Sequence, residues 1–382
     1  MRKKILVVVD CYDRARFFNR FIDADVEVFA ITPRKKYIEN HQFIVKKCNK
    51  FSFVFNLIFK SFQWLDRVKS TIDYHKYGII RSIVSYTYGY TLCKQISNTN
   101  NIHKCFIWNG AQAFSSGVSD AINDAKIEKT FLELANVPGK IFSNHMGVNK
   151  QSSLFHDIKP VEKLNLDEEQ VNKWLTGYLN NLKRESVPQQ YDLVVNDSNN
   201  HRGINKIFAA VKKHLFGNDG QFKMVSDIDW YGLHDSSYVF VPLQVSTDTQ
   251  LILNSKINNE DLVNILLKEK KYRQKKFILK FHPCDSQTSV TKILKLIAGD
   301  SRFKINQGST YTLINNSSEV LTINSTVGME AKLLNKNVTF FGDSFFENMK
   351  RETILKYISG YLLSIDYFKN NSFCKEELNE LL

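Results

Sequence analysis

The sequence contains no apolar stretch that approaches the ~18 consecutive apolar residues of a membrane-spanning helix. Its basic start, residues 1–4, precedes an apolar run over residues 5–9 that ends at Asp10. The hydrophobic part of a signal peptide has about 7–15 residues, so this run is too short for one. We therefore expect a first β-strand here and a cytoplasmic protein.

Paired cysteine motifs are also missing. The six cysteines show no CxxC spacing, which argues against a zinc cluster and against a disulfide framework. The sequence contains no clear metal-ligating cluster of other residue types. It has no zinc-finger or RNP motif and no long basic helix, so nucleic acid is the least favoured partner.

The chain is strongly basic, with a formal net charge of +13. Such a charge favours anionic small substrates or an anionic membrane surface. Residues 46–65 begin with lysines and continue with a dense run of aromatic side chains. This stretch is either an interfacial helix that binds anionic lipid headgroups or a helix of the core or of a dimer interface. The sequence leaves both interpretations open.

Short apolar runs alternate with helical patterns along the whole chain, which is typical of sheets covered by helices. We expect strands at residues 4–10, 26–31, 105–108, 129–134, 238–243, 277–281, 319–323 and 338–341. We expect helices at residues 111–125, 164–182, 261–270, 289–297 and 327–334. A break at residues 185–188 separates two halves. The sequence thus predicts the α/β class, with two Rossmann-like domains facing a cleft.

In such sheets, ligands bind at the carboxyl ends of the strands. In the second half these ends carry small, polar or titratable residues at 244–248, 282–283, 324–326 and 342–343. Ser325 and Thr326 precede a helix, where hydroxyl and backbone N–H groups could bind a phosphate or simply cap the helix.

Three titratable residues have two interpretations each. Pro283 holds His282 in extended geometry at a strand end, where the imidazole donates to a phosphate or only stabilises a loop. Asp248 could attack an anomeric carbon, or it could cap a helix. Glu133 ends a strand of the first half and is either an acid/base group or an exposed strand-end glutamate.

Several motifs together resemble the capsule polysaccharide biosynthesis family of the KpsS, KpsC and LipB type, and the related retaining β-Kdo transferase domain of WbbB. The matching segments are Leu-Gln-Val-Ser-Thr-Asp-Thr-Gln at 243–250, Lys-Phe-His-Pro at 280–283 and Leu-Thr-Ile-Asn-Ser-Thr-Val-Gly at 321–328. A weaker match runs from Glu133 to Asn149.

The resemblance implies a GT-B-like glycosyltransferase that uses CMP-β-Kdo, where Kdo is an acidic sugar. It implies an acceptor-side domain over residues 1–185, a CMP-sugar-binding domain over 190–345 and a C-terminal helical tail over 346–382. By the same resemblance, Asp248 is the nucleophile and Glu133 the general acid/base. The donor-binding residues would be Gln244, Lys280, His282, Pro283, Asn324, Ser325 and Thr326, and the acceptor-binding residues Asn109 and Asn149.

The expected function is therefore retaining transfer of Kdo to a surface-polysaccharide or glycolipid acceptor, without a metal or other cofactor. The expected partners are the CMP-sugar donor, a lipid-linked glycan or phospholipid acceptor and the inner face of the cytoplasmic membrane. Residues 131–136 depart from the family pattern, so the acceptor is not transferred from the resemblance. The alternatives are an inverting, sialyltransferase-like enzyme, a transferase that uses CDP-glycerol, and a non-catalytic capsule export or assembly factor.

Overall fold

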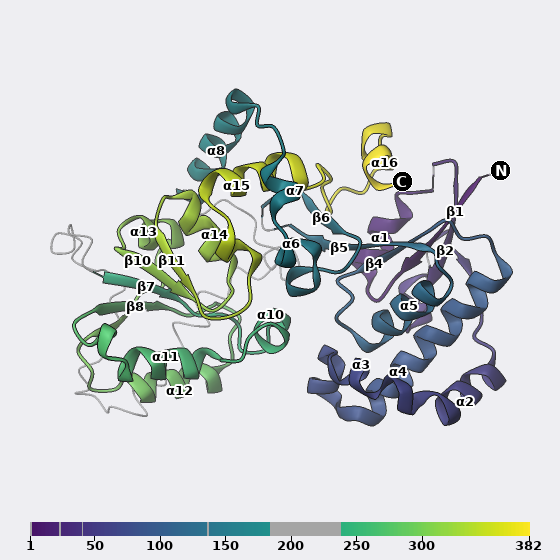
Figure 1. The fold of residues 1–382 in the computed structure, drawn as a ribbon, viewed down its shortest axis with the longest axis horizontal. Helices are drawn as coiled ribbons and strands as arrows, with labels where there is room; N and C mark the ends of the chain where they lie inside the picture. Colours follow the sequence, from purple (N-terminus) through teal and green to yellow (C-terminus); the bar gives the residue numbers. More distant parts are fainter. Residues whose placement is uncertain (1, 23, 40, 136, 184–237) are drawn as a thin grey trace. The chain divides into compact units, whose positions relative to one another are not determined.

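The computed structural model describes residues 2–22, 24–39, 41–135, 137–183 and 238–382. The chain forms two compact units, each built around one sheet (Figure 1). Unit 1 comprises residues 1–157 and 361–382, and unit 2 comprises residues 158–360. Among the described residues, no helix is both long and apolar enough to span a membrane.

The sheet of unit 1 has the strand order β3-β2-β1-β4-β5-β6. All neighbouring strands are parallel except β5 and β6, which are antiparallel. The strands are β1 (Lys3–Val8), β2 (Val26–Ile31), β3 (Ile44–Val45), β4 (Lys104–Trp108), β5 (Glu128–Leu134) and β6 (Ile141–Asn144). The chain order reverses between β1 and β4, which creates a topological switch point there.

Helices cover both faces of this sheet. Ile5, Val7 and Val9 pack into one core with α1 (Tyr12–Asn19) and with the C-terminal residues. Side chains alternate along a strand, so Leu6 and Val8 point to the opposite face. The helices α4 (Ile72–Thr99) and α5 (Ala113–Asp124) lie there (Figure 1).

The chain returns to unit 1 at its C-terminus. Leu363 bridges to Ile141, and α16 (Lys375–Leu381) brings Glu377 to the buried guanidinium of Arg20 at 2.9 Å. Residues 361–382 are therefore part of the first unit, whereas the sequence suggested a separate tail over 346–382.

The sheet of unit 2 is entirely parallel, with the order β11-β10-β7-β8-β9. Its strands are β7 (Tyr238–Pro242), β8 (Lys276–Lys280), β9 (Phe303–Ile305), β10 (Glu319–Thr322) and β11 (Asn337–Phe340). Its helices include α10 (Thr249–Leu253), α11 (Asn259–Lys268), α12 (Gln287–Ile297), α13 (Thr310–Asn315), α14 (Thr326–Leu333) and α15 (Arg351–Lys356). The switch point of this sheet lies between β7 and β10.

Strand β7 is buried on both faces, as a central parallel strand should be. Val239 and Val241 belong to the core that includes α11 and α12. Tyr238 and Phe240 belong to the core on the other face, beneath α13 and α14. The α/β class and the two Rossmann-like domains predicted from the sequence are confirmed, and the cleft between them stays a prediction.

The first unit ends earlier than the predicted boundary at residue 185. Helices α6 (Ser153–His156), α7 (Lys159–Glu162) and α8 (Glu168–Lys183) follow β6. Tyr178 on α8 donates a hydrogen bond to Glu330 of α14 at 3.3 Å, which ties α8 to unit 2. The predicted break at 185–188 and the start of the second domain at 190 lie outside the described residues.

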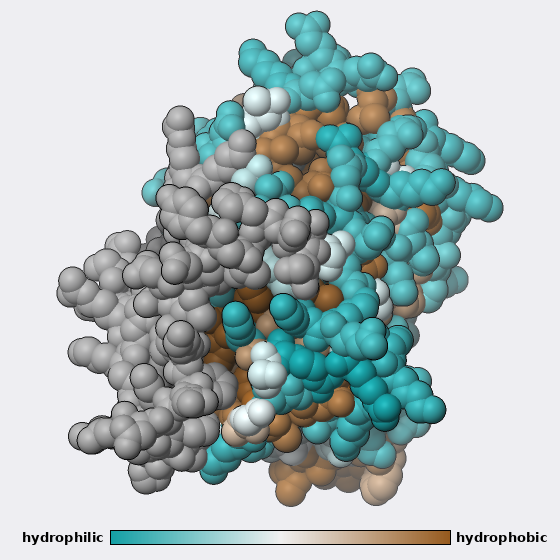
Figure 2. Space-filling model, turned by 90° about the vertical axis from the view of Figure 1, so that its left-hand side faces the viewer, coloured by the Kyte–Doolittle hydropathy of each residue, from teal (hydrophilic) through white to brown (hydrophobic). Residues whose placement is uncertain are grey.

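Most apolar side chains of the two units are used in these cores. In the view of Figure 2, hydrophilic residues, in teal, cover most of the described surface, and hydrophobic residues, in brown, show in smaller groups between them. The main exposed aromatic residues lie on α2 (Lys50–Phe59), on the short turn η2 (Ser61–Trp64) that follows it, and on the first half of α4.

Two glycines allow α4 and α5 to approach closely. A Cβ on Gly89 would lie 2.3 Å from the carbonyl oxygen of Phe114, and a Cβ on Gly117 would lie 2.2 Å from that of Tyr86. Tyr90 on α4 also donates to Asp124 on α5 at 2.6 Å. The two helices therefore cross where neither carries a side chain.

We predict that Gly89→Ala destabilises the protein by about 2–3 kcal/mol, because the new methyl group overpacks against backbone that cannot move aside. Urea unfolding measures this change. Gly177→Ala is the matched control, because Gly177 lies on α8 with nothing within 4 Å of its Cβ position. The control should stabilise by about 0.5–1 kcal/mol, since alanine favours the helix. Equal effects of the two substitutions would contradict the close crossing.

Candidate functional site

The candidate donor site of unit 2 lies at the carboxyl ends of β10, β7 and β8, which are neighbours in the sheet. These ends lead into residues 323–326, 243–248 and 281–286. Because β7 and β10 flank the switch point, the loops that follow them diverge and leave room for a ligand. The sequence placed its donor-binding residues in these three loops.

A network of side-chain amides joins the loops after β7 and β10. Gln244 Nε2 donates to Asn324 Oδ1 at 2.9 Å, and the Asn324 backbone N–H donates to Gln244 Oε1 at 3.0 Å. Asn324 Nδ2 donates to the carbonyl oxygens of Gln250 and Asn254. Asn259 Nδ2 donates to the Gln244 carbonyl oxygen at 2.7 Å. Gln244 and Asn324 thus fix the loops, and their direct contact with a donor stays a prediction.

Asp285 joins the loops after β7 and β8. Its Oδ1 accepts from the backbone N–H and the hydroxyl of Ser246, at 3.0 and 2.7 Å. Its Oδ2 accepts from the Ser289 hydroxyl at 2.9 Å. Asp285 is buried, and we did not single it out from the sequence. Its position just after His282-Pro283, at the start of a helix, is the signal that could have indicated it.

Asp248 is the N-cap of α10. Its Oδ1 accepts from the Gln250 N–H at 2.8 Å, which restrains the rotamer of the carboxylate. The capping role that the sequence offered as an alternative is therefore present. A capping hydrogen bond does not prevent a nucleophilic role, because a carboxylate has two oxygens and several lone pairs.

His282 directly follows Phe281, which is buried, at the end of β8. Its Nδ1 accepts from the Cys284 N–H at 3.2 Å. In the neutral ring, the proton then resides on Nε2, which is the atom able to donate to a phosphate oxygen. Pro283 lies between His282 and Cys284. A proline favours an extended backbone in the residue before it, which here is His282.

Ser325 is the N-cap of α14, and its hydroxyl accepts from the Val327 N–H at 3.2 Å. Thr326 is the first residue of this helix. The helix packs closely on the sheet, because a Cβ on Gly328 would lie 2.5 Å from the Phe340 ring. The helix is thereby held against β10 and β11, which carry Thr322 and Phe340.

Lys280, the last residue of β8, contacts the segment 308–310, and its role in donor binding stays a prediction. Its Nζ donates to the Gly308 carbonyl oxygen and to the Thr310 hydroxyl, both at 2.7 Å. Burial raises the pKa of Glu330 to about 7, although the hydrogen bond from Tyr178 and the charge of Lys280 both lower it. Glu330 lies one turn beyond Thr326 on α14, and the sequence did not suggest it as a site residue.

Unit 1 carries a second polar cluster, at its own switch point. Glu133 at the end of β5 accepts from the Asn109 side-chain amide and from the Leu134 N–H, the latter at 3.0 Å. Asn109 follows β4 in the left-handed conformation, with φ of 59°. Arg14 and Asp10 form a largely buried ion pair beside β1.

The surroundings of Glu133 shift its pKa in opposite directions. Burial raises the pKa of Glu133 above its ordinary value, and the charge of Arg14 is the largest of the effects that lower it. The sequence suggested Glu133 and Asn109 separately, as an acid/base group and an acceptor-binding residue, and the structure brings these two side chains together. It also adds Arg14, which sequence reasoning missed although the i,i+4 spacing from Asp10 is typical of a helical ion pair.

Asn149 lies elsewhere in unit 1. It begins the turn η3 (Asn149–Gln151) after β6, with φ of 54°, and its backbone carbonyl accepts from the Ser152 hydroxyl at 2.7 Å. Its assignment to the acceptor stays a prediction. Among the residues that the structure describes, no group of three or more His, Cys, Asp or Glu side chains could hold a metal ion, and metal independence also stays a prediction.

We predict that the stability of the protein falls between about pH 4.5 and pH 8 because of Glu330. Its folded-state pKa of about 7 lies above its ordinary value of 4.5, so its contribution is complete below 4.5 and is lost as the pH rises through 7. Glu330→Gln should remove about 3 kcal/mol of this loss. Urea unfolding at both ends of the range tests this, with Glu352→Gln, an exposed site, as control. An unchanged pH profile in Glu330→Gln would contradict the prediction.

Several known proteins are similar to this chain. Protein FixF of Sinorhizobium fredii is 35% identical over 114 residues, which is 28% of this chain and 27% of FixF. The chain thus spans about a quarter of the length of this relative.

Two solved structures are similar over most of the chain. The β-Kdo 2,7 transferase of Thermosulfurimonas dismutans KpsC covers all of both chains at 13% identity, with a TM-score of 0.48. The UDP complex of S. aureus MnaA covers 99% of this chain and 95% of its own at 10% identity, with a TM-score of 0.30.

The family model described as "Capsule polysaccharide biosynthesis protein" matches residues 207–349. This range contains Gln244, Asp248, His282, Asn324 and the start of α14. The resemblance identified from the sequence is confirmed over these residues, because the segment 207–349 matches the model of the capsule polysaccharide biosynthesis family.

Proposed function

We propose that the protein is a retaining glycosyltransferase that transfers Kdo from CMP-β-Kdo to a surface-polysaccharide or glycolipid acceptor. One observation carries this proposal. Asp248, His282 and the Ser325-Thr326 helix start lie on loops that follow three neighbouring strands, and the family match spans all of them. Two partly buried hydrogen bonds between side chains, Gln244–Asn324 and Ser246–Asp285, fix these loops relative to one another.

The arrangement supports binding of a CMP phosphate. The start of α14 offers the Ser325 and Thr326 side chains and the positive end of the helix dipole to an anion. His282 Nε2 adds a donor from the loop that follows β8. Such preorganised donors stabilise the charge that develops on the phosphate as CMP leaves. The KpsC neighbour is described as a β-Kdo transferase, which agrees with a CMP-linked acidic sugar as donor.

In the first step of the proposed reaction, a carboxylate oxygen of Asp248 forms a bond to the anomeric carbon of Kdo. The bond from that carbon to the phosphate oxygen breaks, and CMP leaves with the electron pair. In the second step, the acceptor hydroxyl attacks the same carbon and releases Asp248, while Glu133 accepts the hydroxyl proton. Two inversions retain the anomeric configuration. In this scheme the chain's own residues supply every group that reacts, and no metal takes part.

Glu133 suits the second step because its surroundings act on its pKa in opposite directions. Burial raises its pKa and so strengthens it as a base, while Arg14 and the Asn109 amide stabilise its ionised form. A base with a moderately raised pKa takes a proton more readily than an ordinary carboxylate.

Three alternatives make different predictions for the same protein. An inverting transferase would use the phosphate-binding loops but form no bond to Asp248. A transferase that uses CDP-glycerol would release no CMP from CMP-Kdo. A non-catalytic export or assembly factor would turn over neither donor.

The proposed reaction predicts a covalent intermediate on Asp248. Intact-protein mass spectrometry after incubation with CMP-Kdo should show an added mass of one Kdo residue, and Asp248→Asn should show none. Asparagine caps a helix as well as aspartate does, so this variant should keep α10 while losing the nucleophile. Turnover should fall by about a thousandfold or more.

The outcomes separate the alternatives. Release of CMP by Asp248→Asn at the normal rate would exclude the double displacement and favour the inverting enzyme. Absence of both adduct and CMP release in the natural protein would exclude CMP-Kdo as donor. Asp248→Ala provides a check on the cap, since it should cost about 1 kcal/mol of stability that Asp248→Asn retains.

We also predict that Arg14 is a positioning residue for Glu133. Arg14→Gln removes the charge that lowers the pKa of Glu133 and leaves Asp10 uncompensated nearby, so the pKa should rise. The rising limb of the kcat/KM profile against pH should therefore move to higher pH. Arg14→Lys retains the charge and should restore the original profile in large part. A merely structural role for Arg14 would lower activity in Arg14→Gln without moving the limb, and that result would overturn the prediction.

A further inference from the structure

Helix α2 and the turn η2 present a stripe of large apolar side chains to solvent. The side chains of this aromatic stripe are 46–81% exposed: Phe51, Phe55, Ile58, Phe59 and Phe62. Their spacing of three and four residues places them on one face of a helix. Among the described residues of α2, none is buried, so the helix is not a core helix, which was one of the interpretations open from the sequence.

The opposite face of α2 holds the helix against α4. Asn56 Nδ2 donates to the Thr91 hydroxyl at 3.0 Å, and the ring of Phe53 meets that of Tyr88 edge to face at 6.1 Å. Asn49 caps α2, and its backbone N–H donates to Gln95 Oε1 at 2.9 Å. The orientation of α2 is thus fixed by its own contacts, with the more apolar face turned outward. This is the reverse of an ordinary surface helix, which turns its apolar face to the core.

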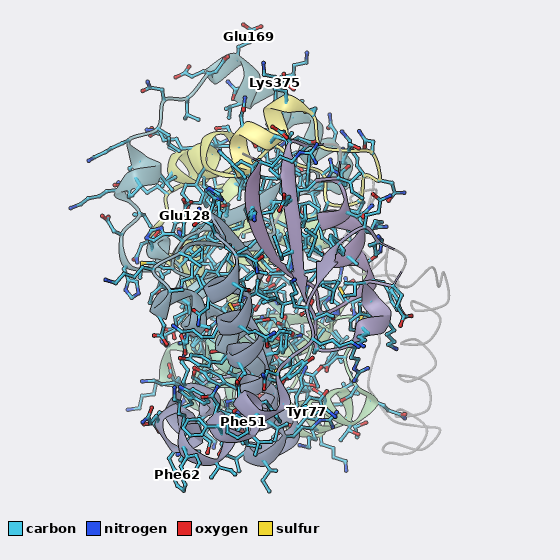
Figure 3. All side chains as sticks on the ribbon, turned by 90° about the vertical axis from the view of Figure 1, so that its right-hand side faces the viewer. Phe51, Phe62, Tyr77, Glu128, Glu169 and Lys375 are labelled. Atoms are coloured by element: carbon cyan, nitrogen blue, oxygen red, sulfur yellow. The ribbon has the colours of Figure 1, made fainter. Side chains whose placement is uncertain are left out.

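The first half of α4 adds a second exposed apolar group. Tyr77, Ile80 and Val84 are 54%, 78% and 40% exposed and recur at helical spacing. The backbone of Gly78, with φ of 76°, breaks α4 here. Figure 3 labels Phe51, Phe62 and Tyr77, which all lie in the lower part of that view. The first half of α4 therefore presents exposed apolar side chains in addition to those of α2 and η2.

The same region is strongly basic. Residues 41–85 contain eight lysines and arginines but only two aspartates and no glutamate. The basic residues are Lys46, Lys47, Lys50, Lys60, Arg67, Lys69, Lys76 and Arg81. Arg67 pairs with Asp120, and Lys69 with Asp66, which leaves a marked excess of positive charge around the aromatic stripe.

We propose that the aromatic stripe and its basic surroundings dock the protein on an anionic lipid bilayer. Aromatic side chains enter the boundary between headgroups and acyl chains, while lysines bind the anionic headgroups. A protein partner is a poorer fit, because protein–protein interfaces are depleted in lysine. Docking here is independent of the proposed transferase chemistry, although it would bring the protein to a lipid-linked acceptor.

Vesicle co-sedimentation without any sugar donor tests this inference. The full chain should bind vesicles of phosphatidylcholine mixed with phosphatidylglycerol, and added salt should weaken the binding. The triple variant Phe51→Ser, Phe59→Ser, Phe62→Ser should bind at least about tenfold more weakly, because each buried phenylalanine contributes strongly to partitioning. These side chains are exposed, so thermal unfolding should be unchanged.

A charge series separates lipid docking from nonspecific attraction. Lys46→Glu, Lys47→Glu, Lys50→Glu together should weaken vesicle binding by at least about tenfold, since each basic residue near the surface contributes about fivefold. The matched control is Lys256→Glu, Lys268→Glu, Lys270→Glu, which makes the same change in charge on exposed lysines of unit 2 and should leave binding nearly unchanged.

Two results would overturn the proposal. One is equal loss of binding in both charge series, which would mean attraction by net charge alone. The other is a natural protein that sediments as a dimer without vesicles, while the triple serine variant is a monomer. That result would assign the stripe to a second copy of this chain instead of a membrane. Neither result depends on donor turnover, so the test is distinct from that of the transferase.

Discussion

The reciprocal hydrogen bonds between Gln244 and Asn324 are the contact on which the arrangement of unit 2 depends. They lie at the switch point, where the loops after β7 and β10 would otherwise diverge without contact. The same network reaches α10 through the Gln250 carbonyl oxygen and α11 through Asn259. Because buried amides are costly when unpaired, the loops have one well-satisfied arrangement, and the residues that they carry share it.

Both units use the same construction. Each contains a mainly parallel sheet with a switch point, and each has polar side chains at the strand ends beside it. In unit 2, neutral amides and Asp285 position the loops. In unit 1, the Arg14–Asp10 ion pair and the amide of Asn109 surround Glu133. Glu133 has the positive charge of Arg14 nearby, whereas Asp285 accepts hydrogen bonds from neutral hydroxyl and backbone N–H groups.

The aromatic stripe illustrates the limits of reasoning from hydrophobicity. Apolar density in residues 51–65 is equally compatible with a core helix and with an interfacial helix, because both need a continuous apolar face. The distinction depends on which face contacts α4, and that contact uses Phe53 and Asn56 rather than the aromatic stripe. Such a choice between faces is made by partners distant in sequence.

The sequence by itself determined the α/β class, most strands of both sheets and the strand-end positions of Asp248, His282, Ser325 and Glu133, because these follow from short-range patterns of apolar runs and turn residues. It did not indicate Asp285, Arg14 or Glu330, nor the return of residues 361–382 to unit 1. Only the tertiary structure decided these, since each depends on side chains that meet across long sequence separations, as Arg20 and Glu377 do. It also decided that Gln244 and Asn324 bond to each other, which no local pattern specifies.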